Sequence, residues 1–403
     1  MATLEKRIIT KIAAARARRR TSPRLVTDLP VRRSVAAGKL REVQFSDFRE
    51  VEEVRRRCGL PADTTENWER LWRRNPALAQ MQPEPPMGWV LEAEGRVVGY
   101  LGNISQLYHY GGRTLTAVTG SGFAVEPTYR ALSLCLVAAY YRQKAVDLYL
   151  TTTASEVVGK IARAFKSDPL PQPDYNNLLF WVVRPYPFAR VLAENLKLRP
   201  SISRMGALLA SVAVGADKIL RRRWPRQGLT GLTVTDISAS KIEDDFQALW
   251  QEKLKENPRL LMADRSPAML RWHFESCSDA ATVRILCCYK KTELLGYAVV
   301  RNEHNHSLRV SIIADTLAKQ DDPVVVRRLW AAAYEYAKRE GSDILQVLGF
   351  PTCLRQLCRQ WRPYLTTTVL PFYYKAAEPM LHKTLSDGMA WYATAFDGDR
   401  TLS

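Results

Sequence analysis

The sequence has few cysteines and no long apolar run. Its seven cysteines are scattered, contain no C-x-x-C pair and have no histidines at the spacing of a zinc site. Such a set is typical of a reducing cytoplasm, where most of these side chains act as small buried apolar groups. The longest apolar run, residues 205–216, is shorter than the ~18 residues that a membrane span requires. The sequence therefore argues against a disulfide-stapled scaffold and against an integral membrane protein.

Signatures of several catalytic and export systems are also missing. No G-x-S-x-G, Walker, Rossmann or zinc-finger pattern occurs. The arginine-rich stretch 16–20 lies where a secretory signal would have its apolar core. His304 and His306 carry metal-ligand side chains, but the sequence offers no third ligand near them, so we expect a solvated turn and no metal. We expect a cytoplasmic protein that can also lie at the periphery of a membrane.

Acidic residues are scarce relative to basic ones, 41 against 59, which gives a formal net charge of +18. Much of the excess lies in residues 1–41, a basic N-terminal arm with twelve Lys and Arg and only two acidic residues. Leu4, Ile8 and Ile12 would lie on one side of a helix in this arm. An anionic membrane surface or nucleic acid could bind it, and both attractions would weaken with salt. A solvated, disordered tail is equally consistent with the sequence.

The length of 403 residues indicates two domains, and two stretches of the chain repeat one order of predicted elements. The first stretch, 42–184, predicts a strand, helical segments, three antiparallel strands, a helix, a strand and a helix. The second stretch, 232–403, predicts the same order. Each also has Gly-Tyr in an apolar strand after a tight turn, at Gly99-Tyr100 and Gly296-Tyr297. Shared order and shared local residues indicate two related domains.

The boundaries of these elements follow from turn residues and hydrophobic periodicity. In the first stretch we expect a strand at 42–48, helical segments at 49–58 and 67–74, strands at 88–95, 96–107 and 114–125, a helix at 132–146, a strand at 147–153 and a helix at 155–166. In the second we expect a strand at 234–238, helices at 242–256 and 268–274, strands at 282–289, 294–302 and 308–315, a helix at 324–339, a strand at 344–349, a helix at 352–361 and closing strands at 367–375 and 391–396.

The segment 185–231 is expected to link the two domains. It contains the apolar run 205–216, followed by the basic residues of 221–226. An apolar run of this length is typical of a helix packed between domains, which we favour. A helix lying on a membrane surface is the alternative.

The stretch 122–135 carries the pattern that points most directly to a ligand. It combines the end of an apolar strand, a proline and a helix that begins with small residues. Because the first backbone N–H groups of a helix have no partner within it, such a helix start is a ready site for phosphate. Val125, Pro127 and Arg130, placed after three strands and before a long helix, resemble the acyl-CoA pyrophosphate loop of the GNAT superfamily of N-acyltransferases. Small residues stand where that loop most often has glycines: Ala131, Ser133 and Cys135.

The resemblance implies an α/β fold, with a mixed sheet in each of two GNAT-like domains arranged in tandem. It also implies that acetyl-CoA or another acyl-CoA lies between two strands that splay apart after the third antiparallel strand. Backbone groups of Phe123, Ala124 and Val125 would face the pantetheine, and Ser155 stands where an asparagine is common. The phosphates would meet Arg130 and the backbone N–H groups of Ala131, Leu132, Ser133, Leu134 and Cys135.

The equivalent helix start of the second stretch lacks these features. Asp321 and Asp322 lie at the positive end of the helix dipole, where they stabilise the helix and repel a pyrophosphate. Valines occupy 324–326, in place of a run of small residues. We therefore expect the first domain to bind acyl-CoA and the second to be a degenerate copy that walls the acceptor groove.

Acylation of an amine needs a base for the ammonium proton and often an acid for the departing thiolate. Many GNAT relatives use a tyrosine as the acid, but the corresponding position falls near Ala162. Glu126, beside the loop, is the candidate base. His109 could line the acceptor side, although a lone histidine is more often structural. Three tyrosines are expected to be packing or surface residues: Tyr140, Tyr141 and Tyr149.

The resemblance favours an N-acyltransferase, in the first instance an N-acetyltransferase, that moves an acyl group from acyl-CoA to an amine. The acceptor would be a small molecule or a polymer, such as an amino sugar or a peptidyl amine. One alternative is a relative of the Fem aminoacyltransferases, which take an aminoacyl-tRNA donor. Another is a non-catalytic binding protein built on two GNAT-like folds. The phosphate-loop helix favours CoA over tRNA.

Overall fold

The structure, a computed structural model, describes residues 38–195, 200–226, 228, 231–274, 283–305, 308–367 and 371–402. They form two compact units, each assembled from separate stretches of the chain. The N-terminal unit contains the described residues up to Pro171, with those of Leu370–Asp387 and Asp397–Ser403. The C-terminal unit contains the described residues of Gln172–Val369 and Gly388–Phe396. In the described ranges, no helix is long and apolar enough to cross a membrane.

The N-terminal unit is built on a mixed sheet with the strand order β1-β2-β3-β4-β5-β15-β6. Strands β1 to β4 pair antiparallel, and β4 pairs parallel with β5. Helices α2 and α4 both pack against β3. The elements are β1 (Lys39–Glu42), η1 (Phe45–Asp47), α2 (Phe48–Arg57), α3 (Thr65–Trp72), η2 (Pro76–Gln80), β2 (Gly88–Ala93), β3 (Arg96–Tyr110), β4 (Arg113–Val125), η3 (Pro127–Leu132), α4 (Ser133–Tyr141), β5 (Leu148–Thr151), α5 (Glu156–Ala164), β6 (Asp168–Pro169), β15 (Tyr373–Ala376) and α12 (Pro379–Thr384).

Two tight turns join the antiparallel strands of this sheet. Glu94 and Gly95 connect β2 to β3 with φ angles of 53° and 74°, and Gly111 and Gly112 connect β3 to β4 with 61° and 74°. Positive φ at both central residues is typical of type I′ turns, whose twist matches that of the flanking strands. The second turn folds β4 back along β3 and so carries the chain to Val125, where the predicted phosphate loop begins.

The C-terminal unit repeats the architecture, with the strand order β14-β7-β13-β12-β11-β10-β8. Its elements are β7 (Asn177–Val182), α6 (Pro185–Asn195), α7 (Pro200–Leu220), β8 (Thr233–Ile237), η4 (Ala239–Lys241), α8 (Asp244–Glu256), β9 (Met262–Ala263), α9 (Pro267–Phe274), β10 (Val283–Lys290), β11 (Glu293–Asn305), β12 (Leu308–Ala318), η5 (Lys319–Asp321), α10 (Pro323–Arg339), β13 (Ile344–Val347), α11 (Thr352–Leu357), η6 (Arg359–Trp361), β14 (Tyr364–Thr367) and η7 (Gly388–Ala390). The predicted repeat of strand, helices, three antiparallel strands, helix and strand is thus confirmed in both units.

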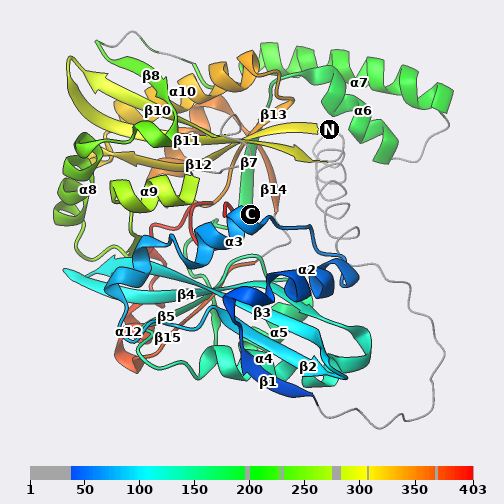
Figure 1. Cartoon of the computed structure of the whole chain (residues 1–403). Coiled ribbons are helices and arrows are strands. Elements are labelled where there is room, and N and C mark those ends of the chain that lie inside the picture. Colours follow the sequence, from blue (N-terminus) through cyan, green and yellow to red (C-terminus); the bar gives the residue numbers. More distant parts are fainter. Residues whose placement is uncertain are drawn as a thin grey trace. The chain divides into compact units, whose positions relative to one another are not determined.

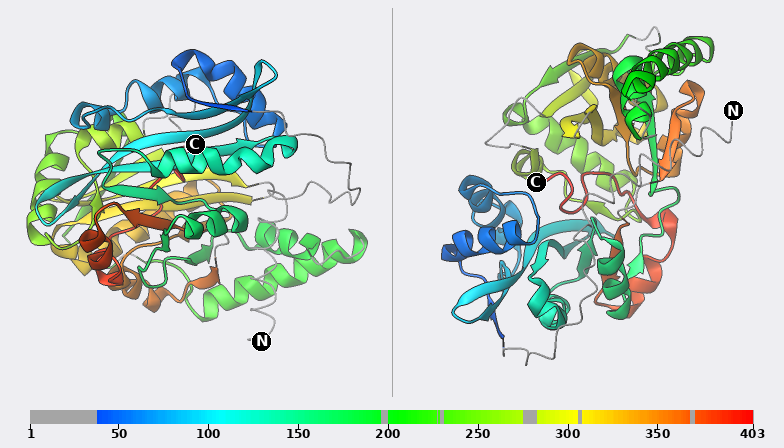
Figure 2. Two further views of the ribbon diagram at one scale, coloured as in Figure 1. Left: turned by 90° about the horizontal axis from the view of Figure 1, so that it is seen from below. Right: turned by 90° about the vertical axis from the view of Figure 1, so that its right-hand side faces the viewer.

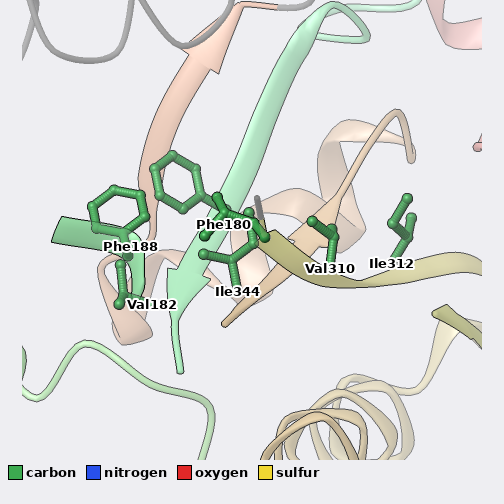
Figure 3. Close-up of a cluster of buried hydrophobic side chains, with 7 residues drawn as sticks. Phe180, Val182, Phe188, Val310, Ile312 and Ile344 are labelled. Carbon is green, nitrogen blue, oxygen red and sulfur yellow. The ribbon is translucent and has the colours of Figure 1, made fainter. Parts of the chain in front are cut away.

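A cluster of buried apolar side chains holds the strands β7, β12 and β13 together with α6 (Figure 3). Phe180 of β7 lies against Phe188 of α6 with ring centroids 5.9 Å apart. Val310 of β12 and Ile344 of β13 belong to the same cluster. The expected linker therefore begins with a helix that is packed onto this sheet.

The two units exchange a strand. β7, which follows α5 in the chain, pairs with β13 and β14 in the C-terminal unit. β15, near the end of the chain, pairs with β5 and β6 in the N-terminal unit. Figure 1 shows β7 beside β13 and β14, and β15 beside β5. Strand pairing therefore crosses the boundary at 184 that the sequence suggests.

Three predicted strands differ from the structure. The strand predicted at 42–48 is wrong, because β1 ends at Glu42 and η1 and α2 follow. The Asp47 carboxylate accepts the N–H of Gln44 at 2.8 Å, a contact that fixes a helix start. The strand predicted at 367–375 is divided between β14 and β15, which belong to different sheets. Residues 391–396 form only isolated bridges, because they fill a gap between two strands instead of extending a sheet.

Candidate functional site

The central strands of the N-terminal unit part early. β4 and β5 pair only from Ala117↔Leu148 to Thr119↔Leu150. Beyond this point β4 continues to Val125 with pairing to β3 alone. We call the separation between residues 120–125 of β4 and the chain that follows β5 the N-terminal fork. The expected splaying of strands after the third antiparallel strand is thus present.

The hydroxyl of Tyr140 lies at the apex of the N-terminal fork. It is 2.9 Å from the carbonyl oxygen of Val118 on β4 and 2.9 Å from that of Leu150 on β5. It also accepts the N–H of Leu150 at 3.2 Å. Burial raises the pKa of this phenol well above its ordinary value. Tyr140 is thus a packing residue, as predicted, and its hydroxyl satisfies backbone groups that the parting strands leave unpaired.

A bulge shapes the β4 side of the N-terminal fork. The pairing with β3 shifts by one residue between Gly102↔Ser121 and Tyr100↔Ala124. Gly122 lies in this bulge with φ of 65°, a conformation that glycine adopts without strain. This length of β4 is partly exposed, since all four of its residues are half-buried: Gly120, Ser121, Gly122 and Phe123.

The predicted phosphate loop leaves β4 directly and leads into α4. η3 ends at Leu132, and α4 begins at Ser133, whose N–H donates to the carbonyl of Arg130. No side chain caps the start of α4. The predicted phosphate-binding residues are accessible: Arg130, Ala131, Leu134 and Cys135 are exposed, and Leu132 and Ser133 are half-buried. Of the predicted pantetheine-facing residues, Phe123 and Val125 are half-buried and Ala124 is buried.

Arginines surround the beginning of this loop. Glu126 forms ion pairs with Arg57 at 2.7 Å and with Arg96 at 2.5 Å. Hydrogen bonds from these two guanidinium groups, Arg96 first, lower the pKa of the Glu126 carboxyl. Burial raises the pKa of Cys58, and Arg130 is near enough to oppose this rise. The ion pairs weaken Glu126 as a base. Its assignment as the catalytic base stays a prediction.

A second carboxylate, which the sequence did not suggest, enters the N-terminal fork from the far end of the chain. Asp399 accepts hydrogen bonds from the hydroxyls of Thr152 at 2.7 Å and Thr153 at 3.1 Å, both just after β5. Ser121 of β4 also hydrogen-bonds it, so the carboxylate connects both sides of the fork. Burial raises the pKa of Asp399. No spacing rule could have found this residue, because 247 positions separate it from Thr152.

The chain around Asp399 is anchored by specific contacts. The side-chain amide of Gln106 donates to the carbonyl of Gly398 at 3.1 Å, and the hydroxyl of Tyr108 donates to the Asp397 carboxylate at 2.8 Å. Gly398 has φ of 78°, and a Cβ at this position would lie 2.2 Å from Thr152. Only glycine fits there, so the backbone approaches Thr152 as closely as the contact of Asp399 requires.

The helix α5 behaves partly as expected. Ser155 is its N-cap, and its hydroxyl accepts the N–H of Val158 at 3.3 Å. Ala162, the position that the sequence comparison set against a tyrosine, is buried against Tyr373 of β15. A Cβ on Gly159 would lie 2.6 Å from the Tyr373 hydroxyl. The exchanged strand therefore brings a tyrosine to the face of α5 that lacks one.

The corresponding fork of the C-terminal unit is filled by the chain itself. β12 and β13 pair only from Val310↔Ile344 to Ile313↔Val347. Residues 391–396 occupy the space beyond, and all six are buried. The N–H of Phe396 donates to Ala314 of β12 at 3.0 Å, and the N–H of Phe350, after β13, donates to Ala393 at 2.8 Å. The donors and acceptors that an acyl-CoA would need here are already in use.

The start of helix α10 in the C-terminal unit carries two aspartate side chains. Asp322 caps α10 by accepting the N–H of Val324 at 2.7 Å. Asp321 pairs at 2.6 Å with Lys253, whose side chain is completely buried. This arrangement agrees with the sequence-based prediction that carboxylates stand at the helix start of the second domain, where the first domain has small residues. In the described part of the chain, no group of three or more His, Cys, Asp or Glu side chains is placed to hold a metal.

Comparison with known proteins gives the fold a name. No protein-family model and no curated protein matches the sequence. Among solved structures, a GCN5-related N-acetyltransferase from Anabaena variabilis is 12% identical, with a TM-score of 0.53 over 85% of this chain and 73% of that one. A probable N-acyltransferase from Enterococcus faecalis is 10% identical, with a TM-score of 0.55 over the same shares. The N-myristoyltransferase of Saccharomyces cerevisiae, solved with bound myristoyl-CoA, is 11% identical, with a TM-score of 0.51 over 88% of this chain and 83% of that one. This protein therefore has the GNAT fold.

Proposed function

We propose that this chain, which has the fold of the GNAT acyltransferases, is an acyl-CoA-dependent N-acyltransferase with its donor site in the N-terminal fork. The main support is the early parting of β4 and β5, directly followed by the uncapped start of α4. The equivalent space of the C-terminal unit contains residues 391–396, and its helix start carries two aspartates. Acetyl-CoA or another acyl-CoA would be the co-substrate, and an amine the acceptor.

The donor would be held mainly by backbone groups. Among the described residues, no strand pairs with 120–125 of β4 on the fork side, so the peptide groups of this stretch can pair with the amides of pantetheine as a strand would. The pyrophosphate would meet the first N–H groups of α4 and the positive end of its dipole. Arg130, exposed in η3, adds a full positive charge. Ala131, Ser133 and Cys135 have small side chains that let phosphate oxygens approach the backbone.

Asp399 is the group that we assign to proton transfer. In the reaction, the amine nitrogen bonds to the thioester carbonyl carbon, the C–S bond breaks, and the thiolate of CoA leaves and takes up the proton that the acylated nitrogen loses. The attacking ammonium must first lose a proton, and the Asp399 carboxylate would accept it. A base with a raised pKa accepts a proton more readily than an ordinary carboxylate, and burial provides that shift. The hydroxyls of Thr152 and Thr153 fix the carboxylate in the fork.

Titration of the full chain with acyl-CoA tests the donor assignment. Calorimetry and thermal shift with acetyl-CoA, myristoyl-CoA and free CoA should show binding, and the chain length that binds most tightly identifies the acyl group. Release of free thiol in the presence of amino sugars or lysine peptides would then report transfer. No heat and no thermal shift with any acyl-CoA would contradict the proposal. Transfer from an aminoacyl-tRNA under those conditions would support the Fem-like alternative instead.

A further inference from the structure

Helix α7 presents one face to the C-terminal unit, and the rest of the described chain leaves its opposite face uncovered. The helix has 21 residues and packs along α6. On its inner side Ala207 is buried, Val214 packs against the cluster of β7 and α6, and Lys218 donates to the carbonyl of Val183 at 2.8 Å. In both views of Figure 2, α7 lies at the outer edge of the C-terminal unit.

The uncovered face is apolar, and we call it the outer face of α7. Its members are between 57% and 81% exposed: Met205, Leu208, Leu209, Val212, Ile219 and Leu220. At about 100° per residue they fall within an arc of roughly 120°, and they extend about 22 Å along the helix. Single exposed apolar residues are ordinary, but a continuous stripe of large ones marks an interaction surface.

Positive charge adjoins this face, and the nearest acid is neutralised. Arg221, Arg222 and Arg226 follow the helix and are all exposed. Asp217 lies beside the stripe, but its carboxylate pairs with Arg221 at 2.8 Å and with Arg223 at 2.7 Å. The sequence places Lys197 and Arg199 just before the helix. The stripe therefore lies between basic residues and is not flanked by an unpaired acid within the described part of α7.

We propose that α7 is a membrane-surface helix, whose outer face inserts at the headgroup boundary of an anionic lipid layer while the flanking arginines contact lipid phosphates. An anionic surface matches the charge of this region and of the whole chain, +18. A second copy of the chain carries the same positive charge and would be repelled, so it fits the surface less well. The helix is not long and apolar enough to span the bilayer, so it lies on it. This proposal is independent of the acyltransferase assignment.

Vesicle co-sedimentation of the full chain tests the proposal. The protein should bind vesicles that contain phosphatidylglycerol more tightly than vesicles of phosphatidylcholine alone, and the preference should weaken as salt rises. Replacing Leu209→Glu together with Val212→Glu should weaken binding by at least about tenfold, because two apolar side chains then oppose insertion. Arg222→Gln should reduce only the preference for the anionic lipid.

A matched control substitutes an equally exposed apolar residue elsewhere. Met380 of α12 is 66% exposed, so Met380→Glu makes the same kind of change in polarity outside α7 and should leave vesicle binding unchanged. Equal loss in both variants, or no binding of the unaltered protein to either vesicle, would overturn the proposal. A second result would also overturn it: light scattering shows a dimer, Leu209→Glu with Val212→Glu converts that dimer to a monomer, and vesicles bind neither form. The outer face of α7 would then be a contact between two copies of the chain.

Discussion

The N–H of Leu150 on β5 donates to the hydroxyl of Tyr140 on α4 at 3.2 Å, at the point where β5 parts from β4. The same hydroxyl lies 2.9 Å from the carbonyl oxygen of Val118 on β4. A single side chain therefore ends the pairing of the two strands without leaving their last polar groups unpaired. The helix that supplies Tyr140 is α4, and the predicted phosphate loop leads into the start of the same helix. A single helix therefore contributes to both the N-terminal fork and the phosphate loop.

Removing this hydroxyl should destabilise the N-terminal unit. Tyr140→Phe keeps the ring but leaves a buried N–H and a carbonyl without their partner, which costs about 1–3 kcal/mol in free energy of unfolding. Urea denaturation measures the change. Tyr186→Phe, at a residue of α6 that is 47% exposed, is the control and should change stability very little. Equal stability of the two variants would show that backbone groups at the fork find another partner.

Asp399→Asn should slow transfer without weakening donor binding. The amide has nearly the same shape but cannot accept a proton, and general bases typically contribute about 100-fold to 10,000-fold to a rate. Affinity for acyl-CoA should stay within about twofold of the unaltered protein, because backbone groups and α4 make the donor contacts. Steady-state kinetics and calorimetry together check this. An unchanged rate would remove Asp399 from the mechanism.

The pH dependence of the rate is a separate consequence. Asp399 must be ionised to accept a proton, so kcat/KM should rise with pH across a pKa above the ordinary 3.8 of a carboxyl and then level off. Its contacts at the fork are the neutral hydroxyls of Thr152, Thr153 and Ser121. In Asp399→Asn this rise should be absent.

The same shift predicts how stability changes with pH. A carboxyl whose pKa is raised in the folded state favours folding when protonated. Its contribution is therefore complete below pH 3.8 and is lost as the pH rises through the raised pKa. The free energy of unfolding of the unaltered protein, relative to Asp399→Asn, should fall as pH increases through that window. Denaturation series at several pH values measure the difference, and a constant difference would mean that Asp399 has an ordinary pKa in the folded protein.

Features that depend on neighbouring residues could be predicted from the sequence. The tight turn that the sequence predicts before Gly99-Tyr100 lies at Glu94-Gly95, and the helix that it predicts from residue 155 has Ser155 as its N-cap. The acidic start of helix α10, at Asp321 and Asp322, could also be predicted, because both residues lie directly before the helix in the sequence. In each case the physical cause lies within a few positions along the chain.

Features that depend on distant residues could not be predicted in this way. β7 and β15 are apolar strands of ordinary composition, and nothing in their side chains says which sheet they join. Residues 391–396 have the pattern of a strand, yet they fill the fork between β12 and β13. Asp399 meets Thr152, just after β5, although 247 positions separate the two residues in the chain. Contacts between residues far apart in the chain decide which sheet β7 and β15 join, where residues 391–396 lie and what Asp399 contacts. Local periodicity carries no information about such contacts.

Glu126→Gln distinguishes a structural role of this carboxylate from a catalytic one. The substitution removes the charge that pairs with Arg57 and Arg96, and exposed pairs of this kind contribute about 1 kcal/mol or less. Because the pKa of Glu126 is lowered in the folded state, its contribution is present above the ordinary carboxyl pKa and is lost as the pH falls through the lowered one. We expect a small loss of stability near neutral pH and a rate within a few-fold of the unaltered protein. A loss of rate as large as that of Asp399→Asn would restore Glu126 as the base.

Ser133→Glu should abolish acyl-CoA binding if the start of α4 holds the pyrophosphate. The new carboxylate would lie in the first turn, where it would repel the phosphates, as Asp321 and Asp322 are placed to do in the C-terminal unit. A negative charge at a helix start also stabilises the helix, so loss of binding would not reflect unfolding. Val324→Glu makes the matched change at the start of α10, where residue 324 is 40% exposed, and should leave the affinity unchanged. Calorimetric titration of both variants with the same acyl-CoA measures the contrast. Retention of binding in Ser133→Glu would show that the phosphates lie elsewhere, even if the N-terminal fork receives the pantetheine.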